Sequence, residues 1–212
     1  HAVASRLDAP LVHDAARVNL TQVAGRLAVF FRGLGGPAGV DIRPVEDEQS
    51  HHRLSFRRRL GTDTERVPRA SFDGEALRLP SSLAIYPVPE ANAALYLWLT
   101  AAAAHATATP DLPGDPLQAD LATIATATSL TAATLASAPG LAPLYRELAA
   151  ALLAHRPAPP GGATERAVEA HIRHALGDPT PPPALPPFAP RGYRPFRPVA
   201  LWPDLRALTY SL

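Results

Sequence analysis

The residues best suited to chemistry in this chain are two histidines on a predicted helix. His171 and His174 are three residues apart, a spacing that places both imidazole rings on one helix face, and Glu169 is close in sequence. Such a face can offer ligands to a metal ion, but a protein zinc site needs at least a third ligand. No third ligand is evident in the sequence, so a solvated helix face flanked by arginines is the simpler interpretation.

The remaining motifs do not predict catalysis. The chain has no cysteine, which excludes disulfides, thiolate metal ligands and cysteine nucleophiles, and it has no Gly-x-Ser-x-Gly elbow. The glycine-rich residues 33–39 follow a predicted helix and lack the Gly-Lys-Ser/Thr of a phosphate loop, so they predict a helix end and a turn. His51 and His52 also lack a third metal ligand, and Glu46 and Glu48 are more typical of a solvated loop than of a general acid–base pair. We therefore predict a protein that is not an enzyme, with no catalytic residue, no bound metal and no cofactor.

Arginine clusters are the other candidate binding groups. Arg57, Arg58 and Arg59 are consecutive, and later arginines alternate with aromatic residues. Arginine beside aromatic rings can bind single-stranded nucleic acid, but useful affinity at physiological salt needs several phosphate contacts. The net charge of +1 provides no strong general attraction to nucleic acid. We predict that these arginines face a protein partner or solvent and that the chain binds no nucleic acid.

The elements that position these groups are mostly helices, because apolar residues recur at spacings of three and four. The predicted helices span residues 14–34, 89–107, 116–137, 141–155 and 164–176. Pro89 stands at a favourable first position of its helix, whereas Asp115 and Thr164 are predicted N-caps. Residues 40–42 predict a short strand, and residues 50–60 are ambiguous, with helix favoured.

A small β-hairpin is expected among these helices. Residues 67–72 and 75–79 flank the dipeptide Asp73-Gly74, which favours a type I′ turn because both central residues of that turn need positive φ. Pro68 cannot donate a ladder hydrogen bond, so the first strand should lie at an edge. We therefore predict a hairpin insert near residues 65–80.

Prolines concentrate towards the C-terminal end of the chain. Their density between residues 179 and 198 favours extended polyproline II backbone, which cannot build a core of its own. Aromatic residues accompany the prolines at Phe188, Tyr193, Phe196 and Trp202. These rings favour an arm that lies across the domain, because in a free linker they would stay exposed. We predict a helical domain over residues 1–178 and a Pro-rich arm or linker over residues 179–212, and hence a mainly α fold with a small β-hairpin and a Pro-rich C-terminal arm.

The middle of the chain carries very little charge. Residues 91–145 contain no arginine, and their acids are Asp111, Asp115 and Asp120. Such helices are either deeply buried or form an interface. The longest apolar run, near residues 91–104, is shorter than the roughly 20 residues that a membrane span requires. We predict a cytoplasmic protein, a compartment with which the absence of cysteine agrees.

A more specific likeness appears at residues 73–104. The run Asp-Gly-Glu-Ala-Leu-Arg-Leu-Pro-Ser-Ser-Leu-Ala-Ile-Tyr-Pro at 73–87, followed by Asn-Ala-Ala-Leu-Tyr-Leu-Trp-Leu-Thr from Asn92, resembles the N-terminal region of NorD and its relative CbbO. The segment Phe-Arg-Pro-Val-Ala-Leu-Trp at 196–202 is similar to the part of these proteins that leads to their later domains. Residues 53–61 match more loosely.

The resemblance implies a non-catalytic adaptor or chaperone. Proteins of this family carry a C-terminal von Willebrand A domain and work with a MoxR-type AAA+ ATPase, a hexamer that would supply the energy. NorD-like members help to mature nitric oxide reductase, a metalloenzyme of denitrification, by assisting insertion of its non-haem iron. CbbO-like members assist Rubisco activation instead. The metal-ion-dependent adhesion site belongs to the von Willebrand domain, whose Asp-x-Ser-x-Ser motif is absent here, so no family metal ligand is carried over.

An adaptor of this kind needs anchors at its partner interface, and aromatic and arginine side chains are the usual ones. The predicted partner-binding residues are Arg57, Arg58, Arg59, Tyr96, Trp98 and Trp202. For the tryptophans the alternative is an ordinary place in the core. Two alternatives to the nitric oxide reductase role also stay open: a Rubisco-directed adaptor, and a metal-dependent enzyme that uses His171 and His174.

Overall fold

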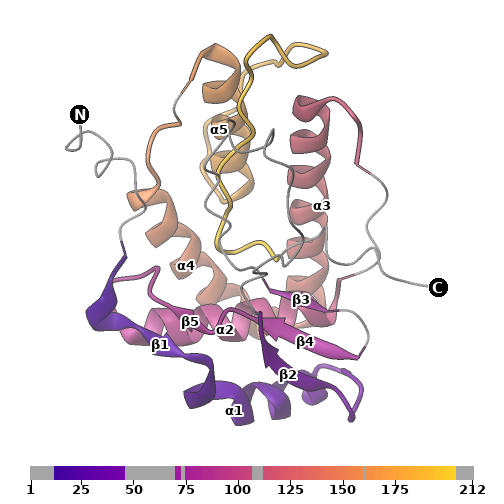
Figure 1. Ribbon diagram of the computed structural model, residues 1–212, viewed down its shortest axis with the longest axis vertical. Coiled ribbons are helices and arrows are strands. Elements are labelled where there is room, and N and C mark those ends of the chain that lie inside the picture. The colour runs from indigo at the N-terminus through magenta and orange to yellow at the C-terminus, as the bar shows by residue number, and fades with distance from the viewer. Residues whose placement is uncertain (1–11, 46–69, 73–74, 107–111, 160, 204–212) are drawn as a thin grey trace, which may run out of the picture.

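The computed structural model describes residues 12–45, 70–72, 75–106, 112–159 and 161–203. Its helices are α1 (Leu20–Gly33), α2 (Pro89–Ala104), α3 (Pro116–Ser137), α4 (Ala142–His155) and α5 (Ala163–Ala175). In Figure 1, α1, α2 and the short strands form one end of the molecule, and α3, α4 and α5 lie beyond them. The predicted fold class, a mainly α domain with a small β-hairpin and a Pro-rich arm, is confirmed.

The first helix, α1, begins at Leu20, which is later than predicted. Ahead of it, β1 (Val18–Asn19) pairs antiparallel with β5 (Ser82–Leu83), and this distant partner holds the backbone extended. The backbone N–H of Asn19 donates to Gln22 Oε1 at 2.7 Å, one half of the capping box with which the helix starts. The buried residues of this helix are Leu20, Val23, Leu27 and Phe31.

A second, three-stranded sheet has the order β2-β4-β3. β4 (Ala76–Leu79) is its central strand, and β2 (Asp41–Pro44) lies parallel to it, while β3 (Ser71–Phe72) lies antiparallel at the other edge. Leu77 and Leu79 on β4 are fully buried. The strand predicted at residues 40–42 therefore exists, but its parallel partner is far away in the sequence and was not predicted.

The hairpin of the predicted fold class is the β3–β4 pair, although its register differs from the prediction. Phe72 lies opposite Leu77, so residues 73–76 separate the paired positions. A type I′ turn centred on Asp73-Gly74 would have placed Phe72 opposite Glu75 instead. Phe72 packs edge-on against Phe31 of α1, with ring centroids 5.3 Å apart. The observed register is shifted by two residues from the predicted one, so Phe72 points to the same face of the sheet in both and can contact Phe31 in either.

The helix at the centre of the core is α2, which begins at Pro89 as predicted. Its buried side chains include Leu95, Tyr96 and Trp98, each 0% exposed. Asn92 is also 0% exposed, and its side chain accepts hydrogen bonds from the N–H groups of Ile85 and Tyr86 and donates to Ala16 O and Tyr86 O, all within 3.0 Å. At α2, the weakly charged middle of the chain is therefore buried inside this domain.

The bounds of α3 agree with the prediction, because neighbouring residues in the sequence determine where the helix starts. Asp115 Oδ1 accepts the N–H groups of Leu117 and Gln118 at 3.0 Å, and Pro116 takes the first helical position. α4 begins at Ala142, after a short 3-10 turn at Pro139–Leu141. Unlike α2, α3 leaves exposed a face of alanine, threonine and serine.

The N-cap predicted for α5 was wrong. Thr164 lies inside the first turn, and the cap residue is Gly162, whose N–H donates to Glu165 Oε2 at 2.8 Å. Glu165 thereby closes the start of the helix in the way that a capping-box acid does. The helix ends before Gly177, where a φ of +108° suits a residue without a side chain.

Several predictions fall outside the described residues. They are the helix favoured at residues 50–60, the edge-strand Pro68, the pairs Glu46/Glu48 and His51/His52, and the arginine cluster at 57–59. The domain boundary at residue 178 and the continuation towards a von Willebrand A domain stay predictions. In the ranges described, no single helix is long and apolar enough to cross a membrane, although α3 and residues Pro139–His155 together meet the length and composition requirements as a pair bent by 112°.

Candidate interaction site: the C-terminal arm and its carboxylate anchors

Residues 179–203, which we call the arm, lie across the helices without regular secondary structure. In Figure 1 the arm runs from the end of α5 back between α5 and α3. Backbone groups along this path hydrogen-bond to side chains of α3 and α5 and to Asp115 and Arg156, which flank α3 and α4. Because the partners are side chains, the sequence itself determines where the arm lies.

Two aspartates at the start of α3 hold the middle of the arm. Asp115 Oδ2 accepts the N–H of Ala189 at 3.0 Å, while Asp120 Oδ2 accepts the Tyr193 hydroxyl at 2.6 Å and the N–H of Phe196 at 3.0 Å. Asp120 is only 3% exposed. A buried carboxylate is costly unless it receives hydrogen bonds, so Asp120 and the arm satisfy each other.

The pKa values of Asp115 and of Tyr193 are both shifted in this site. The amide of Gln118, with smaller contributions from the amides of Ala189 and Leu117, holds the pKa of Asp115 below its usual value against a weaker opposing effect of burial. Burial, followed by the hydrogen bond to Asp120 and its negative charge, raises the pKa of Tyr193. Tyr193 therefore stays a neutral hydrogen-bond donor over the physiological pH range.

A third carboxylate anchor comes from α5. Glu165 Oε1 accepts the N–H of Arg194 at 3.1 Å, while its other oxygen caps the helix. Burial works to raise the pKa of Glu165, but backbone amides, including those of Arg194 and Gly162, and the Arg194 charge together lower it. Glu165 thus joins the start of α5 to the arm while carrying its negative charge.

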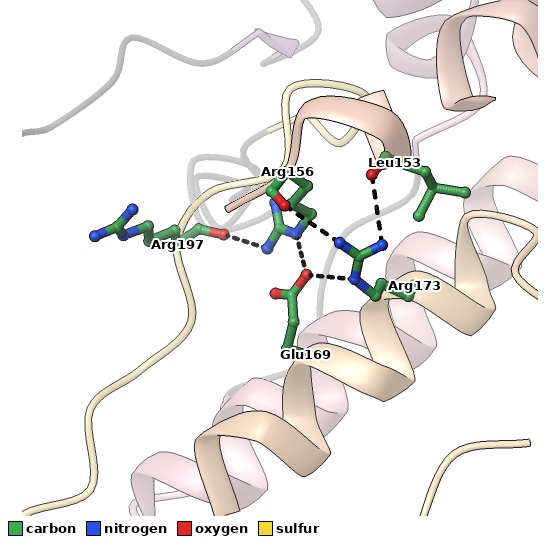
Figure 2. Close-up of polar contacts among 5 residues, drawn as sticks. All are labelled: Leu153, Arg156, Glu169, Arg173 and Arg197. Carbon is green, nitrogen blue, oxygen red and sulfur yellow. Dashed lines mark hydrogen bonds and ion pairs between the residues drawn. The ribbon is translucent and has the colours of Figure 1, made fainter. Parts of the chain in front are cut away.

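A buried ion-pair cluster ties α4, α5 and the arm together, as Figure 2 shows. Glu169 Oε1 receives the Nε–H of Arg156 at 2.7 Å and lies 3.5 Å from Nε of Arg173. The side chains of Arg156 and Glu169 are 6% and 9% exposed. Arg156 also donates to Arg197 O in the arm, and Arg173 donates to Leu153 O and Arg156 O at the end of α4. The two guanidinium groups therefore neutralise the carboxylate and satisfy the last carbonyls of a helix.

The last part of the arm enters the core. Val199, Leu201 and Trp202 are buried, and Leu201 O accepts the indole N–H of Trp98 at 2.8 Å. Phe196 meets Trp202 edge-to-face, with ring centroids 6.2 Å apart. The arm is thus anchored by apolar burial at this end and by hydrogen bonds along its length.

The structure places the predicted partner-binding aromatic residues in the core. Tyr96 and Trp98 are 0% exposed and Trp202 is 5% exposed, and for the two tryptophans a place in the core was the stated alternative. Tyr96 donates its hydroxyl to Pro80 O at 2.7 Å. These rings have almost no exposed surface, so a partner would reach them only after the surrounding segments had moved. Their role in binding stays a prediction. The other predicted anchors, Arg57–Arg59, lie outside the described residues.

The two histidines considered as metal ligands contact backbone carbonyls instead. His171 Nε2 lies 3.0 Å from Pro183 O, and His174 Nδ1 lies 3.0 Å from Asp178 O. Glu169 is engaged by Arg156 and does not join them. Within the part of the chain that the structure describes, no three or more His, Asp or Glu side chains gather in a way that would hold a metal ion.

Sequence reasoning did not identify the carboxylates that hold the arm. A signal was nevertheless present for two acids: Asp120 is the only acid within α3, and Glu169 on α5 lies between the apolar residues Val168 and Ile172. An acid within an apolar stretch is typical of a buried, partnered group. The identity of the partners depends on contacts between residues far apart in the chain.

The amino-acid sequence of this chain is similar to those of several known proteins. Protein NorD of Brucella suis biovar 1 (strain 1330) is 39% identical over 195 residues, which cover 89% of this chain and 31% of that protein. Protein NorD of Stutzerimonas stutzeri is 32% identical over 165 residues, or 77% of this chain and 25% of that protein. An uncharacterised protein of Pseudomonas aeruginosa is 34% identical over 167 residues, or 78% of this chain and 26% of that protein.

The likeness therefore covers most of this chain but a smaller part of each relative. The chain spans about a third of the length of the first of these proteins and about a quarter of the others. No protein-family model matches the chain, and no solved structure matches it.

Proposed function

Because the chain is NorD-like over 89% of its length, we propose that it is a non-catalytic adaptor region that acts in the activation of nitric oxide reductase. The observation that carries this proposal is the sequence identity to proteins named NorD in Brucella suis and Stutzerimonas stutzeri. These relatives favour nitric oxide reductase over Rubisco as the target. The proposed place of action is the cytoplasm.

The proposed mechanism couples an ATPase to the target enzyme. A MoxR-type AAA+ ATPase supplies the energy, and the adaptor transmits it to the reductase so that its non-haem iron can be inserted. An adaptor needs a stable platform and a surface that a partner can reach. The buried α2 is suited to the first task, and the arm held along α3 and α5 is suited to the second.

The metal-dependent alternative has less support from the geometry. The ring nitrogens of His171 and His174 that contact protein atoms face carbonyl oxygens of residues 178–183, and Glu169 neutralises arginine. The adaptor hypothesis explains the likeness to NorD, and it needs no metal ion at His171 or His174.

Direct binding to the ATPase tests the proposal. The purified chain is mixed with the purified MoxR-type ATPase encoded in the same genome, with ATP, with ADP and without nucleotide, and complex formation is followed by light scattering during size-exclusion chromatography. The proposal predicts a complex whose stability depends on nucleotide. If no complex forms in any of the three conditions, the adaptor role with this ATPase is wrong.

A further inference from the structure

One part of the arm is apolar yet turned to solvent. Residues 181–188, with the sequence Pro-Pro-Pro-Ala-Leu-Pro-Pro-Phe, are exposed except at Pro182 and Leu185, which are half-buried. We call these residues the proline edge. Phe188 at its end is 69% exposed, more than the other exposed large hydrophobic residues of the described chain. An exposed aromatic ring beside a row of exposed prolines is an unusual use of apolar surface in a soluble domain.

The proline edge is held in place although its side chains face outward. His171 Nε2 contacts Pro183 O at 3.0 Å, Gln118 Nε2 donates to Pro187 O at 2.8 Å, and Asp115 accepts the N–H of Ala189 at 3.0 Å. These contacts involve backbone atoms of the edge, so they leave the rings of the prolines and of Phe188 available. A partner that bound here would meet a backbone already ordered, which lowers the entropic cost of association.

The chemistry of the edge restricts the kind of partner that fits. Proline lacks a backbone N–H, so most of the edge offers carbonyl acceptors and no donors, and it cannot be completed as a strand of a partner's sheet. Extended proline-rich segments are instead received by grooves lined with aromatic side chains, whose N–H and O–H groups donate to the exposed carbonyls. Arg191 and Arg194 are exposed just beyond the edge, which favours carboxylates at the rim of the groove.

We propose that the proline edge, with Phe188 as its anchor, docks into an aromatic-lined groove with an acidic rim on the partner protein. The inference rests on the proposed function, because the partner it names is the MoxR-type ATPase. It goes beyond that function by assigning the contact to one eight-residue segment of the arm, rather than to the aromatic residues of the core or to the outer face of α3.

The test measures how single substitutions change the affinity for the ATPase. The chain is labelled with a fluorophore at its N-terminus and titrated with the ATPase in the nucleotide state that gives the tightest complex, and fluorescence anisotropy reports binding. Phe188→Ser is expected to weaken binding by at least about tenfold, the usual loss when a buried aromatic contact is removed. Pro183→Ala with Pro186→Ala keeps the carbonyls but loses the rings, and it is expected to weaken binding as well.

Val29→Ser is the matched control, because Val29 is 63% exposed on α1, whereas the contacts that hold the proline edge come from α3, α5 and Asp115. The control is expected to bind like the unmodified chain, and all variants are expected to keep the same thermal unfolding midpoint. If the chain binds the ATPase and the edge variants bind equally well, the inference is wrong while the proposed function stands. If the unmodified chain does not bind, both are wrong.

A second copy of this chain is the competing occupant. Light scattering of the chain alone, over a range of concentrations, distinguishes the two cases. A monomer whose ATPase binding depends on Phe188 supports the inference. A dimer that Phe188→Ser dissociates, with ATPase binding unchanged, overturns it in favour of self-association.

Discussion

The side chain of Asn92 forms hydrogen bonds of 3.0 Å or less with four backbone groups. Its single amide group links the residues before β1, the loop after β5 and the first turn of α2 through Ala16 O, the N–H groups of Ile85 and Tyr86, and Tyr86 O. Ala16 is 76 residues from Asn92 in the sequence, so their hydrogen bond joins the segment before β1 to the start of α2. Its importance follows from the rule that buried backbone groups need partners.

Asn92→Ala is therefore expected to destabilise the domain by roughly 3 kcal/mol, because it leaves several buried donors and acceptors without partners. Chemical denaturation followed by circular dichroism measures the change in the free energy of unfolding. Asn19→Ala, at the exposed start of α1, is the control and should cost about 1 kcal/mol or less. Equal losses in the two variants would contradict the role assigned to Asn92.

Glu169 is the second residue whose removal should be severe. It neutralises Arg156 in a site where both side chains are less than a tenth exposed, at 6% and 9%. Glu169→Ala leaves buried arginine without its counter-charge, and the expected loss is about 3–5 kcal/mol. Glu147→Ala, an exposed acid on α4, is the control and should change stability by less than about 0.5 kcal/mol. A Glu169 variant as stable as this control would show that the cluster does not hold α4, α5 and the arm together.

At the scale of elements, the arm is a segment with no regular structure of its own that is fixed by side chains. Asp120 is its central anchor, because one carboxylate oxygen receives both Tyr193 and Phe196. Asp120→Ala is expected to speed hydrogen exchange at the Phe196 amide by at least about tenfold, the effect of losing a hydrogen bond to a charged acceptor. Exchange measured by NMR should stay unchanged in α1 and α2.

Two further variants serve as comparisons for Asp120→Ala. Tyr193→Phe removes only one of the bonds to Asp120 and should have a smaller effect on the Phe196 amide. Thr128→Ala, at an exposed position of the same helix, should have none. If Asp120→Ala left exchange in the arm unchanged, the carboxylates would not be what holds the arm.

The arm anchors also predict a dependence on pH. The pKa values of Asp115 and Glu165 in the folded protein lie below the usual values of these side chains. A depressed folded pKa means that the carboxylates stabilise the folded state above the unfolded pKa and that this contribution disappears as the pH falls through the folded value. The thermal midpoint should therefore be nearly flat from neutral pH down to about pH 5 and should fall below that. In the double variant Asp115→Asn and Glu165→Gln the acid-induced fall should be shallower, and an unchanged slope would contradict this origin.

The elements also show which parts of the fold a sequence can predict. The bounds of α3 were predicted correctly because Asp115 and Pro116 start the helix and Pro139-Gly140 follows its end, all within a few residues. The start of α1 was predicted wrongly because β1 pairs with β5, and the parallel β2–β4 pair was missed for the same reason. Helix capping depends on residues that are close in the sequence, whereas strand pairing depends on partners far away in the chain.

The same limit applies to the candidate site. The sequence predicted an arm and its aromatic residues, and the structure confirms the arm. A place in the core was an alternative that the sequence left open for Trp98, but the sequence could not predict that Trp98 would donate to Leu201 O, a contact across most of the second half of the chain. Aromatic residues suit cores and interfaces equally well, so composition alone does not separate the two.

At the scale of the whole molecule, the helical core provides stability and the arm provides an exposed surface. The core is stabilised by α2 and by the buried polar groups of Asn92 and Glu169, while the arm presents the proline edge on its outer side. The chain matches about a third of the length of NorD from Brucella suis. We propose that this chain contributes the contact with a partner.

The most direct test of the adaptor account is the activity of nitric oxide reductase in cells that lack the gene encoding this chain. The account predicts reductase polypeptide at normal levels but with low activity and low non-haem iron, both restored when the gene is returned on a plasmid. Full reductase activity and iron content in the deletion strain would contradict it.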